Sequence, residues 1–123
     1  MLTDEKRFGT EFTKFPGGGL KKGEGMTECL KREFREELGI EIEAWEHFYT
    51  TDFFQASYFD QSEQIISVYY KVSYQAWNTI NITDKSMDFS KSEQIFRWVS
   101  LDKLNENELT FPIDKHVVGI LKS

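Results

Sequence analysis

The chain has 123 residues, 39% of them hydrophobic and 15% aromatic, which suits one buried core rather than two, so we expect a single domain over residues 1–123. Its formal net charge of −6 argues against broad binding to a nucleic-acid backbone, and an anionic substrate would need help from metal ions. Cys29 is the only cysteine, which excludes an internal disulfide, and no apolar run reaches the roughly 20 residues that span a bilayer, so we expect a cytoplasmic protein without membrane partners.

The start of the chain shows no clear period. Residues 1–14 are mostly polar with irregularly spaced phenylalanines, and Pro16 and three glycines then interrupt any regular element. We therefore predict a loop over this stretch and a glycine loop at residues 17–19, with the alternative that "LTDEKR" at residues 2–7 is the tail of a strand.

The next segment predicts a helix from about Met26 to Leu38. Apolar residues recur there at spacings of four, at Leu30, Phe34 and Leu38. Gly25 stands at the N-cap position, and Gly39 stands where a left-handed C-cap is expected. We expect the apolar stripe to anchor this helix to the core.

The rest of the chain alternates strand and turn patterns before a closing helix. Strands are predicted from Ile40 toward Phe54, at Ile65–Tyr74, at Ile80–Thr83 and at Ile95–Val99. A turn with a short helical piece follows at residues 100–107, and a last helix at Ile113–Leu121 packs through Val117, Val118 and Leu121. This order indicates an α/β fold with a mixed sheet covered by helices.

Glutamates crowd the predicted Met26–Leu38 helix. Glu33, Glu36 and Glu37 lie three and four residues apart, so their carboxylates share a face and repel one another. A hard divalent cation would turn this repulsion into binding, because Mg²⁺ takes carboxylate, water and phosphate oxygens. The alternative is a solvated helix face preceded by a capping loop.

Residues near these glutamates fit the same interpretation. Glu24 adds an oxygen donor close to the start of the helix, and the glycine loop allows bare backbone to approach a metal or phosphate. Arg32 lies four residues before Glu36 and next to Glu33, so its guanidinium can hold a carboxylate in a fixed orientation.

The spacing of these residues matches a known motif. The Nudix box reads G-x5-E-x7-R-E-U-x-E-E-x-G-U, where U is a bulky apolar residue, and it matches Gly18, Glu24, Arg32, Glu33, Phe34, Glu36, Glu37, Gly39 and Ile40. The sequence thus resembles the Nudix hydrolases, which cleave nucleoside diphosphates linked to another group. The "FPGG" before the box and the "RWVSLDKL" at residues 97–104 are similar to segments common in that family.

The resemblance implies a Nudix-like α/β/α sandwich with a mixed sheet. Because no strand pattern is seen before Pro16, we expect a domain that is shortened at its N-terminus and lacks the usual first strand or strands, with an unpaired edge that could favour a homodimer. The implied metal is Mg²⁺ or Mn²⁺, and its implied ligands are Glu33, Glu36, Glu37 and the backbone carbonyl of Gly17, with support from Glu24.

The general base has two candidates. Glu33 or Glu36 of the box is the first, with Arg32 as their partner in the catalytic group. Glu93, immediately before a predicted strand, is the second, because in this family a downstream glutamate can reach the metals. Its alternative role is that of a solvated loop acid.

Substrate contacts are expected from the glycine loop and its surroundings. Gly18 and Gly19 would approach phosphates, and Arg7 and Lys14 could bind the distal ones, although ordinary solvated cations would give the same pattern. Tyr58 follows Ile40 at a spacing that resembles the tyrosine marker of dinucleoside polyphosphate hydrolases, and a packed or surface tyrosine is the alternative.

The leading functional hypothesis is a metal-dependent hydrolase that acts on the pyrophosphate of a small nucleotide-derived substrate. One alternative is a Nudix-fold module that binds or senses a nucleotide without hydrolysing it. An isomerase on the same fold is a third hypothesis, for which the sequence offers no extra catalytic residues.

Overall fold

The computed structural model describes residues 1–80, 82, 86–90 and 92–123. The chain divides into two compact units. The first comprises Met1–Pro16, Tyr49–Val68 and Ile82–Ser123, and the second comprises Gly17–Phe48 and Tyr69–Asn81.

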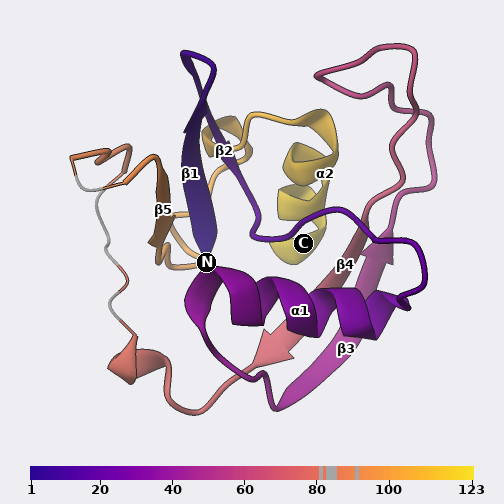
Figure 1. Cartoon of the computed structure of the whole chain (residues 1–123). Helices are drawn as coiled ribbons and strands as arrows, with labels where there is room; N and C mark the ends of the chain where they lie inside the picture. Colours follow the sequence, from indigo (N-terminus) through magenta and orange to yellow (C-terminus); the bar gives the residue numbers. More distant parts are fainter. Residues whose placement is uncertain (81, 83–85, 91) are drawn as a thin grey trace. The chain divides into compact units, whose positions relative to one another are not determined.

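The first unit is built on a three-stranded sheet in the order β2-β1-β5 (Figure 1). Its strands are β1 (Leu2–Arg7), β2 (Thr10–Lys14) and β5 (Gln94–Arg97). The central strand β1 runs antiparallel to both neighbours, with Leu2 opposite Arg97 and Thr3 opposite Lys14. Residues that lie more than 80 positions apart in the chain, such as Leu2 and Arg97, therefore meet in one sheet.

The prediction of a loop over residues 1–14 is wrong, because β1 and β2 form a hairpin there. Arg7 pairs with Thr10, and the two turn residues, Phe8 and Gly9, both have positive φ, at 50° and 77°. Two-residue hairpin turns with positive φ usually read Asn-Gly or Asp-Gly, so Phe-Gly conceals the turn. Two strands thus precede Pro16, and the expectation of missing first strands loses the observation on which it rested.

The positive φ of Phe8 indicates backbone strain in this turn that can be measured. Its side chain is 98% exposed, so it contributes little to packing, while a left-handed conformation costs a non-glycine residue about 1 kcal/mol. We expect Phe8→Asn to stabilise the protein by up to about 1 kcal/mol and to raise the Tm by a few degrees in a thermal melt followed by circular dichroism. An unchanged or lower Tm would contradict this assignment of strain.

The core of the first unit lies beside β1. Leu2 packs with Leu104, Leu109 and Val118, and Phe15, Val99 and Leu121 cover this cluster from its sides. The helix α2 (Pro112–Leu121) begins with a proline in its first turn, and the 3₁₀ turn η2 (Glu106–Glu108) precedes it. The predicted turn and closing helix are confirmed.

A buried ion pair crosses the same sheet. The Asp4 carboxylate, fully buried, accepts hydrogen bonds from Arg97 Nε at 2.8 Å, from the Thr13 hydroxyl at 2.6 Å and from the Met87 backbone N–H at 2.9 Å. Arg97 also reaches Glu108 at 3.3 Å. Each carboxylate oxygen of Asp4 has a donor, which is the condition for a tolerable buried charge.

The second unit carries the glutamate-rich helix α1 (Met26–Leu38), whose predicted bounds and caps are confirmed. Gly25 is the N-cap, and Gly39 takes the left-handed C-cap conformation at φ 67°. The apolar stripe at Leu30, Phe34 and Leu38 is only half-buried, and the structure, which describes the whole of α1, buries none of its residues fully. The stripe therefore anchors the helix less deeply than predicted. The ring centroids of Phe34 and Trp77 lie 6.3 Å apart.

The remaining strands are shorter than the sequence predicts. β3 (Ala44–Thr50) pairs with β4 (Val68–Ser73) in a separate two-stranded sheet, whereas one mixed sheet was expected. Ile40 and Ile42 are buried although they precede β3. The strand was predicted to begin at Ile40 because hydrophobic alternation indicates burial, which does not require backbone pairing. The predicted strand at Ile80–Thr83 lies in part outside the described residues.

Candidate active site

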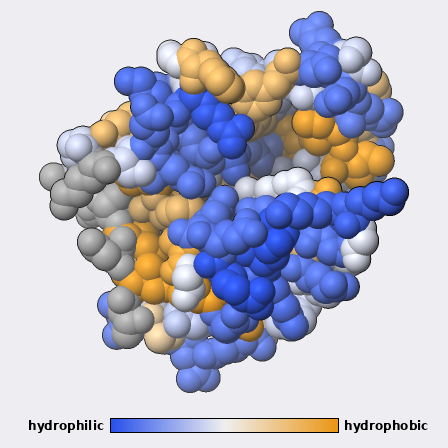
Figure 2. All heavy atoms as spheres, viewed as in Figure 1, coloured by the Kyte–Doolittle hydropathy of each residue, from blue (hydrophilic) through white to orange (hydrophobic). Residues whose placement is uncertain are grey.

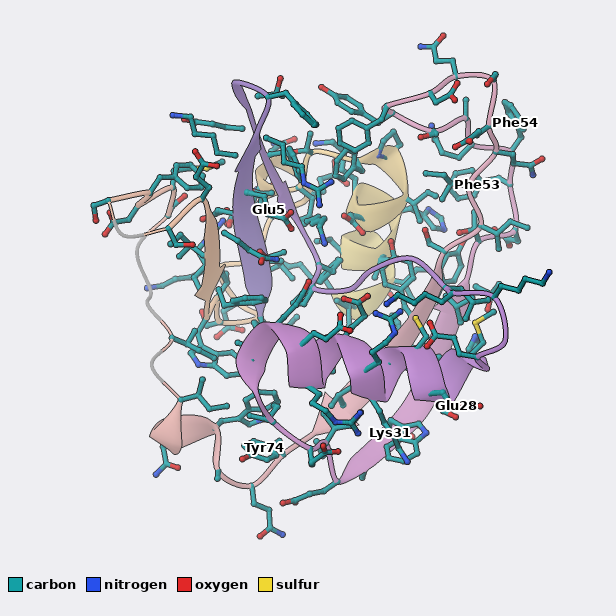
Figure 3. All side chains as sticks on the ribbon, viewed as in Figure 1. Glu5, Glu28, Lys31, Phe53, Phe54 and Tyr74 are labelled. Atoms are coloured by element: carbon teal, nitrogen blue, oxygen red, sulfur yellow. The ribbon has the colours of Figure 1, made fainter. Side chains whose placement is uncertain are left out.

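The glycine loop and the charged helix belong to the same unit, so their mutual geometry is defined. Figure 3 shows the carboxylates and cations along α1, where Glu28 and Lys31 are labelled. At the start of the helix, the Glu28 carboxylate accepts a hydrogen bond from the Gly25 N–H, which is the half of a capping box that a glycine N-cap permits. This cap sets where the loop joins the helix.

Arg32 is the hub of the site. Its Nε and Nη2 hold the two oxygens of Glu24 at 3.0 and 2.7 Å, and its Nη1 holds Glu33 at 2.8 Å and Glu36 at 3.2 Å. Nη2 also donates to the backbone carbonyl of Gly19 at 3.0 Å. One planar guanidinium therefore ties three carboxylates to the glycine loop, in the orienting role that the sequence predicts.

Glu24 is fixed more firmly than its neighbours. It accepts from Arg32 and from the Lys21 backbone N–H at 2.8 Å, and these two bonds lower the pKa of the Glu24 carboxyl to about 2. Glu24 is therefore anionic at neutral pH, and a carboxylate with so low a pKa is a weak proton acceptor. Its carboxylate joins the Lys21 backbone to the Arg32 guanidinium.

Gly18 lies directly against the Glu33 carboxylate. A Cβ atom built at Gly18 would lie 2.2 Å from Glu33 Oε1 and 2.4 Å from Glu33 Cδ, far inside van der Waals contact. Only glycine allows this approach of loop and carboxylate. Gly18, the glycine that begins the box, is thus required for this packing against Glu33, the glutamate that follows Arg32.

The family model described as the NUDIX domain matches residues 1–118 of the chain. The chain belongs to the Nudix hydrolase family. This match spans both compact units, and the glycine loop, α1 and β1–β5 all lie inside the matched range.

 One similar protein is the 8-oxo-dGTP diphosphatase of Buchnera aphidicola subsp. Schizaphis graminum (strain Sg). It is 26% identical over 96% of this chain and 78% of its own length.

Two further similarities agree with this family. The mRNA-decapping protein OPG122 of Variola virus (isolate Human/India/Ind3/1967) is 30% identical over 88% of the chain, which spans only 42% of that viral protein's length. A solved structure from work on MutT of Aliivibrio salmonicida and Vibrio cholerae covers 98% of this chain and 82% of its own, with a TM-score of 0.63 and 21% identity. The last similarity shows the α/β Nudix fold.

The box residues of this Nudix protein fit a divalent cation by their chemistry. Carboxylate oxygens are the donors that Mg²⁺ and Mn²⁺ prefer, and the close approach of Gly18 brings loop backbone beside the Glu33 carboxylate. Glu37 lies half-buried on α1, one residue from Glu36. Among the described residues, however, no three His, Cys, Asp or Glu side chains are grouped closely enough to hold a metal, and both Glu33 and Glu36 accept hydrogen bonds from Arg32.

The other predicted site residues, which are Arg7, Lys14, Tyr58 and Glu93, belong to the first unit. Lys14 Nζ pairs with Glu5 at 3.2 Å, and Arg7 lies 3.9 Å from the same carboxylate. Tyr58 packs edge-on against Phe111 at 5.1 Å. Glu93 is exposed beside β5, and its carbonyl accepts a hydrogen bond from the Lys6 N–H. Their roles toward substrate stay predictions.

Sequence reasoning missed two contacts inside the site. The Cys29 thiol lies 3.7 Å from the Gly19 carbonyl and 3.6 Å from Arg32 Nη2, and Lys21 supplies its backbone N–H to Glu24. Cys29 precedes Arg32 by three residues, so helical spacing could have placed the two side chains on one face. The Lys21 contact depends on the loop conformation, which no spacing rule describes.

Across the described part of the chain, no helix is both long and apolar enough to cross a membrane.

Proposed function

We propose that this Nudix protein is a divalent-metal-dependent hydrolase that cleaves the pyrophosphate linkage of a nucleoside diphosphate joined to another group. The observation that carries the proposal is the Arg32 hub, which holds Glu24, Glu33 and Glu36 against the glycine loop. A solvated helix face would not need one guanidinium to gather three carboxylates and a loop carbonyl. The arrangement preorganises a negatively charged surface next to exposed loop backbone.

The proposed metal ligands are Glu33, Glu36 and Glu37, with the Gly17 carbonyl beside them. When bound, Mg²⁺ or Mn²⁺ would neutralise the negative charge of the pyrophosphate and lower the pKa of water at the site. Arg32 keeps the carboxylates in a common orientation, and Glu24 holds Arg32 in turn. The Gly18–Gly19 backbone leaves room for phosphate oxygens.

Glu33 or Glu36 is the proposed acceptor of the proton from the attacking water. Both lie within hydrogen-bond distance of Arg32, which holds them in place, whereas Glu24 is too weak a base. Glu93 remains the second proposed base. The variants Glu33→Gln, Glu36→Gln and Glu93→Gln compared side by side would separate these choices.

The names of two relatives direct the choice of substrates. One is an 8-oxo-dGTP diphosphatase and the other an mRNA-decapping protein. We propose to assay nucleoside triphosphates, including 8-oxo-dGTP, and 5′-capped RNA first, together with diphospho-sugars and dinucleoside polyphosphates. All of these carry a nucleoside diphosphate linked to a further group.

The central test measures phosphate or pyrophosphate release from this panel with Mg²⁺. We expect chelation by EDTA to abolish turnover and Glu37→Gln to lower kcat/KM by about 100-fold or more, because removal of a group that stabilises transition-state charge has effects of this size. Glu46→Gln, which changes an exposed glutamate of β3, is the matched control and should leave turnover unchanged. Turnover that persists in EDTA or in Glu37→Gln would contradict the proposal.

The alternative of a nucleotide-binding or sensor module predicts a different result. Tight nucleotide binding in calorimetry without any product would favour that module. A panel with neither binding nor product would leave both functions unsupported by these substrates and contradict the proposed substrate class.

A further inference from the structure

The segment between β3 and β4, residues 51–67, forms an ordered hairpin within the first unit, which we name the aromatic hairpin. Backbone N–H to carbonyl bonds of 2.8–2.9 Å join its arms, from Thr51 to Ser67, from Ile65 to Gln55 and from Ser57 to Glu63. At the tip, the Ser57 hydroxyl accepts from the N–H groups of Phe59 and Asp60 at 3.3 Å. The hairpin is therefore preorganised by its own hydrogen bonds.

This hairpin displays large apolar side chains to solvent. The most exposed are Phe54 at 74%, Ile66 at 66%, Phe59 at 59% and Tyr58 at 55%. An antiparallel bridge joins Ala56 to Gln64, and Phe54 and Ile66 lie two residues outside it on opposite arms. Figure 2 shows hydrophobic surface on this part of the first unit, and Figure 3 labels Phe53 and Phe54 on the hairpin. Apolar side chains gathered on one ordered element are typical of an interaction surface.

Aromatic contacts from the tip and from one arm fix the hairpin to the core of its unit. The Phe59 ring packs against Phe12, which is 2% exposed, at 5.8 Å, and the Tyr58 ring contacts Phe111 at 5.1 Å. Phe53 packs edge-on against the His116 ring of α2 at 5.4 Å. These contacts hold one side of the hairpin in place, so Phe54 and Ile66 are presented from a rigid support.

The charges on the hairpin are all negative. Its acidic side chains are Asp52, Asp60 and Glu63, all exposed, and residues 51–67, which the structure describes throughout, contain no Lys or Arg. The Ser62 hydroxyl and its backbone N–H both donate to Asp60, and these bonds lower the pKa of the Asp60 carboxyl. The apolar residues are thus bordered by acidic side chains and by no Lys or Arg of the hairpin.

This combination selects one kind of partner. Nucleic acids and anionic membranes carry charge of the same sign as the hairpin, so both would be repelled. A second copy of the chain would bring a further formal charge of −6 to the contact. An arginine side chain suits the surface best, because a guanidinium stacks on aromatic faces and also pairs with carboxylates.

We propose that the aromatic hairpin is a docking surface for an arginine-rich segment of a partner protein. Phe54 and Ile66 supply the apolar contact, and Asp52, Asp60 and Glu63 supply the charge that attracts the segment. The residues that carry this contact, Phe54 and Ile66 with the three acidic side chains, include none of the box residues.

The test measures the fluorescence anisotropy of labelled octa-arginine and octa-lysine peptides with the full chain in about 150 mM salt, where long-range attraction is screened. We expect octa-arginine to bind more tightly than octa-lysine. The double substitution Phe54→Ser with Ile66→Ser should weaken octa-arginine binding about tenfold or more, because loss of central apolar contacts has effects of this size. Phe8→Asn, which removes an exposed aromatic ring from the β1–β2 turn, should bind like the unchanged protein.

Three outcomes would overturn the proposal. The first is equal affinity of the double variant and the unchanged protein, which would show diffuse attraction to an acidic chain. The second is tighter binding of an oligouridylate RNA than of octa-arginine. The third is self-association in the ultracentrifuge that the double substitution abolishes, which would make a second copy the occupant. Circular dichroism melts of each variant confirm that it is folded, so that loss of binding reports the surface.

Discussion

Gly18→Ala is expected to inactivate the proposed hydrolase while leaving its fold intact. The added methyl group would meet the Glu33 carboxylate at 2.2 Å, and the end of a flexible side chain is the part of the structure that can most easily move away. Glu33 would then leave its place on Arg32, although the backbone need not shift. We expect kcat/KM to fall about 100-fold, as for small misplacements of reacting groups, with little change in Tm.

Gly119→Ala is the matched control for this substitution. Gly119 lies on α2, where an added Cβ would meet no atom within 4 Å, so turnover should stay unchanged. Steady-state kinetics and thermal melts of both variants provide the comparison. Full activity of Gly18→Ala would show that the position of the Glu33 carboxylate does not matter for turnover.

Arg97→Met is expected to have the largest effect on stability. It would leave the fully buried Asp4 carboxylate without its cationic partner, and removal of one member of a buried ion pair costs about 3–5 kcal/mol. Urea unfolding followed by tryptophan fluorescence measures this difference directly. A loss that large is a substantial part of the total stability of a domain of this size.

Arg35→Met provides the contrast on the surface. Arg35 donates to Glu41 at 3.0 Å, but the two side chains are 56% and 66% exposed. Exposed pairs contribute about 0–1 kcal/mol, so this variant should unfold close to the midpoint of the unchanged protein. Equal losses in the two variants would show that burial of the Asp4–Arg97 pair does not set its contribution.

The helix and its caps could be predicted because their signals are local. Each turn of α1 depends on residues three and four positions away, and Gly39 marks the C-cap through its own backbone preference. The β1–β2 hairpin was missed because Phe8 occupies a position that usually holds Asn or Asp. The bounds of β3 and β4 were overestimated because hydrophobic alternation continues past the paired residues.

By itself, the sequence determined the family, the helix that carries the box and the residues that Arg32 could reach along that helix. These features follow from spacing, since a helix places residues three and four apart on one face. Only the tertiary structure decided which residues that are distant in the chain contact one another. Asp4 meets Arg97 across a sheet, the Glu24 carboxylate folds back onto Arg32, and Gly18 lies against Glu33. Such contacts depend on how strands pair and loops close, and these are set by the packing of the whole chain rather than by local preference.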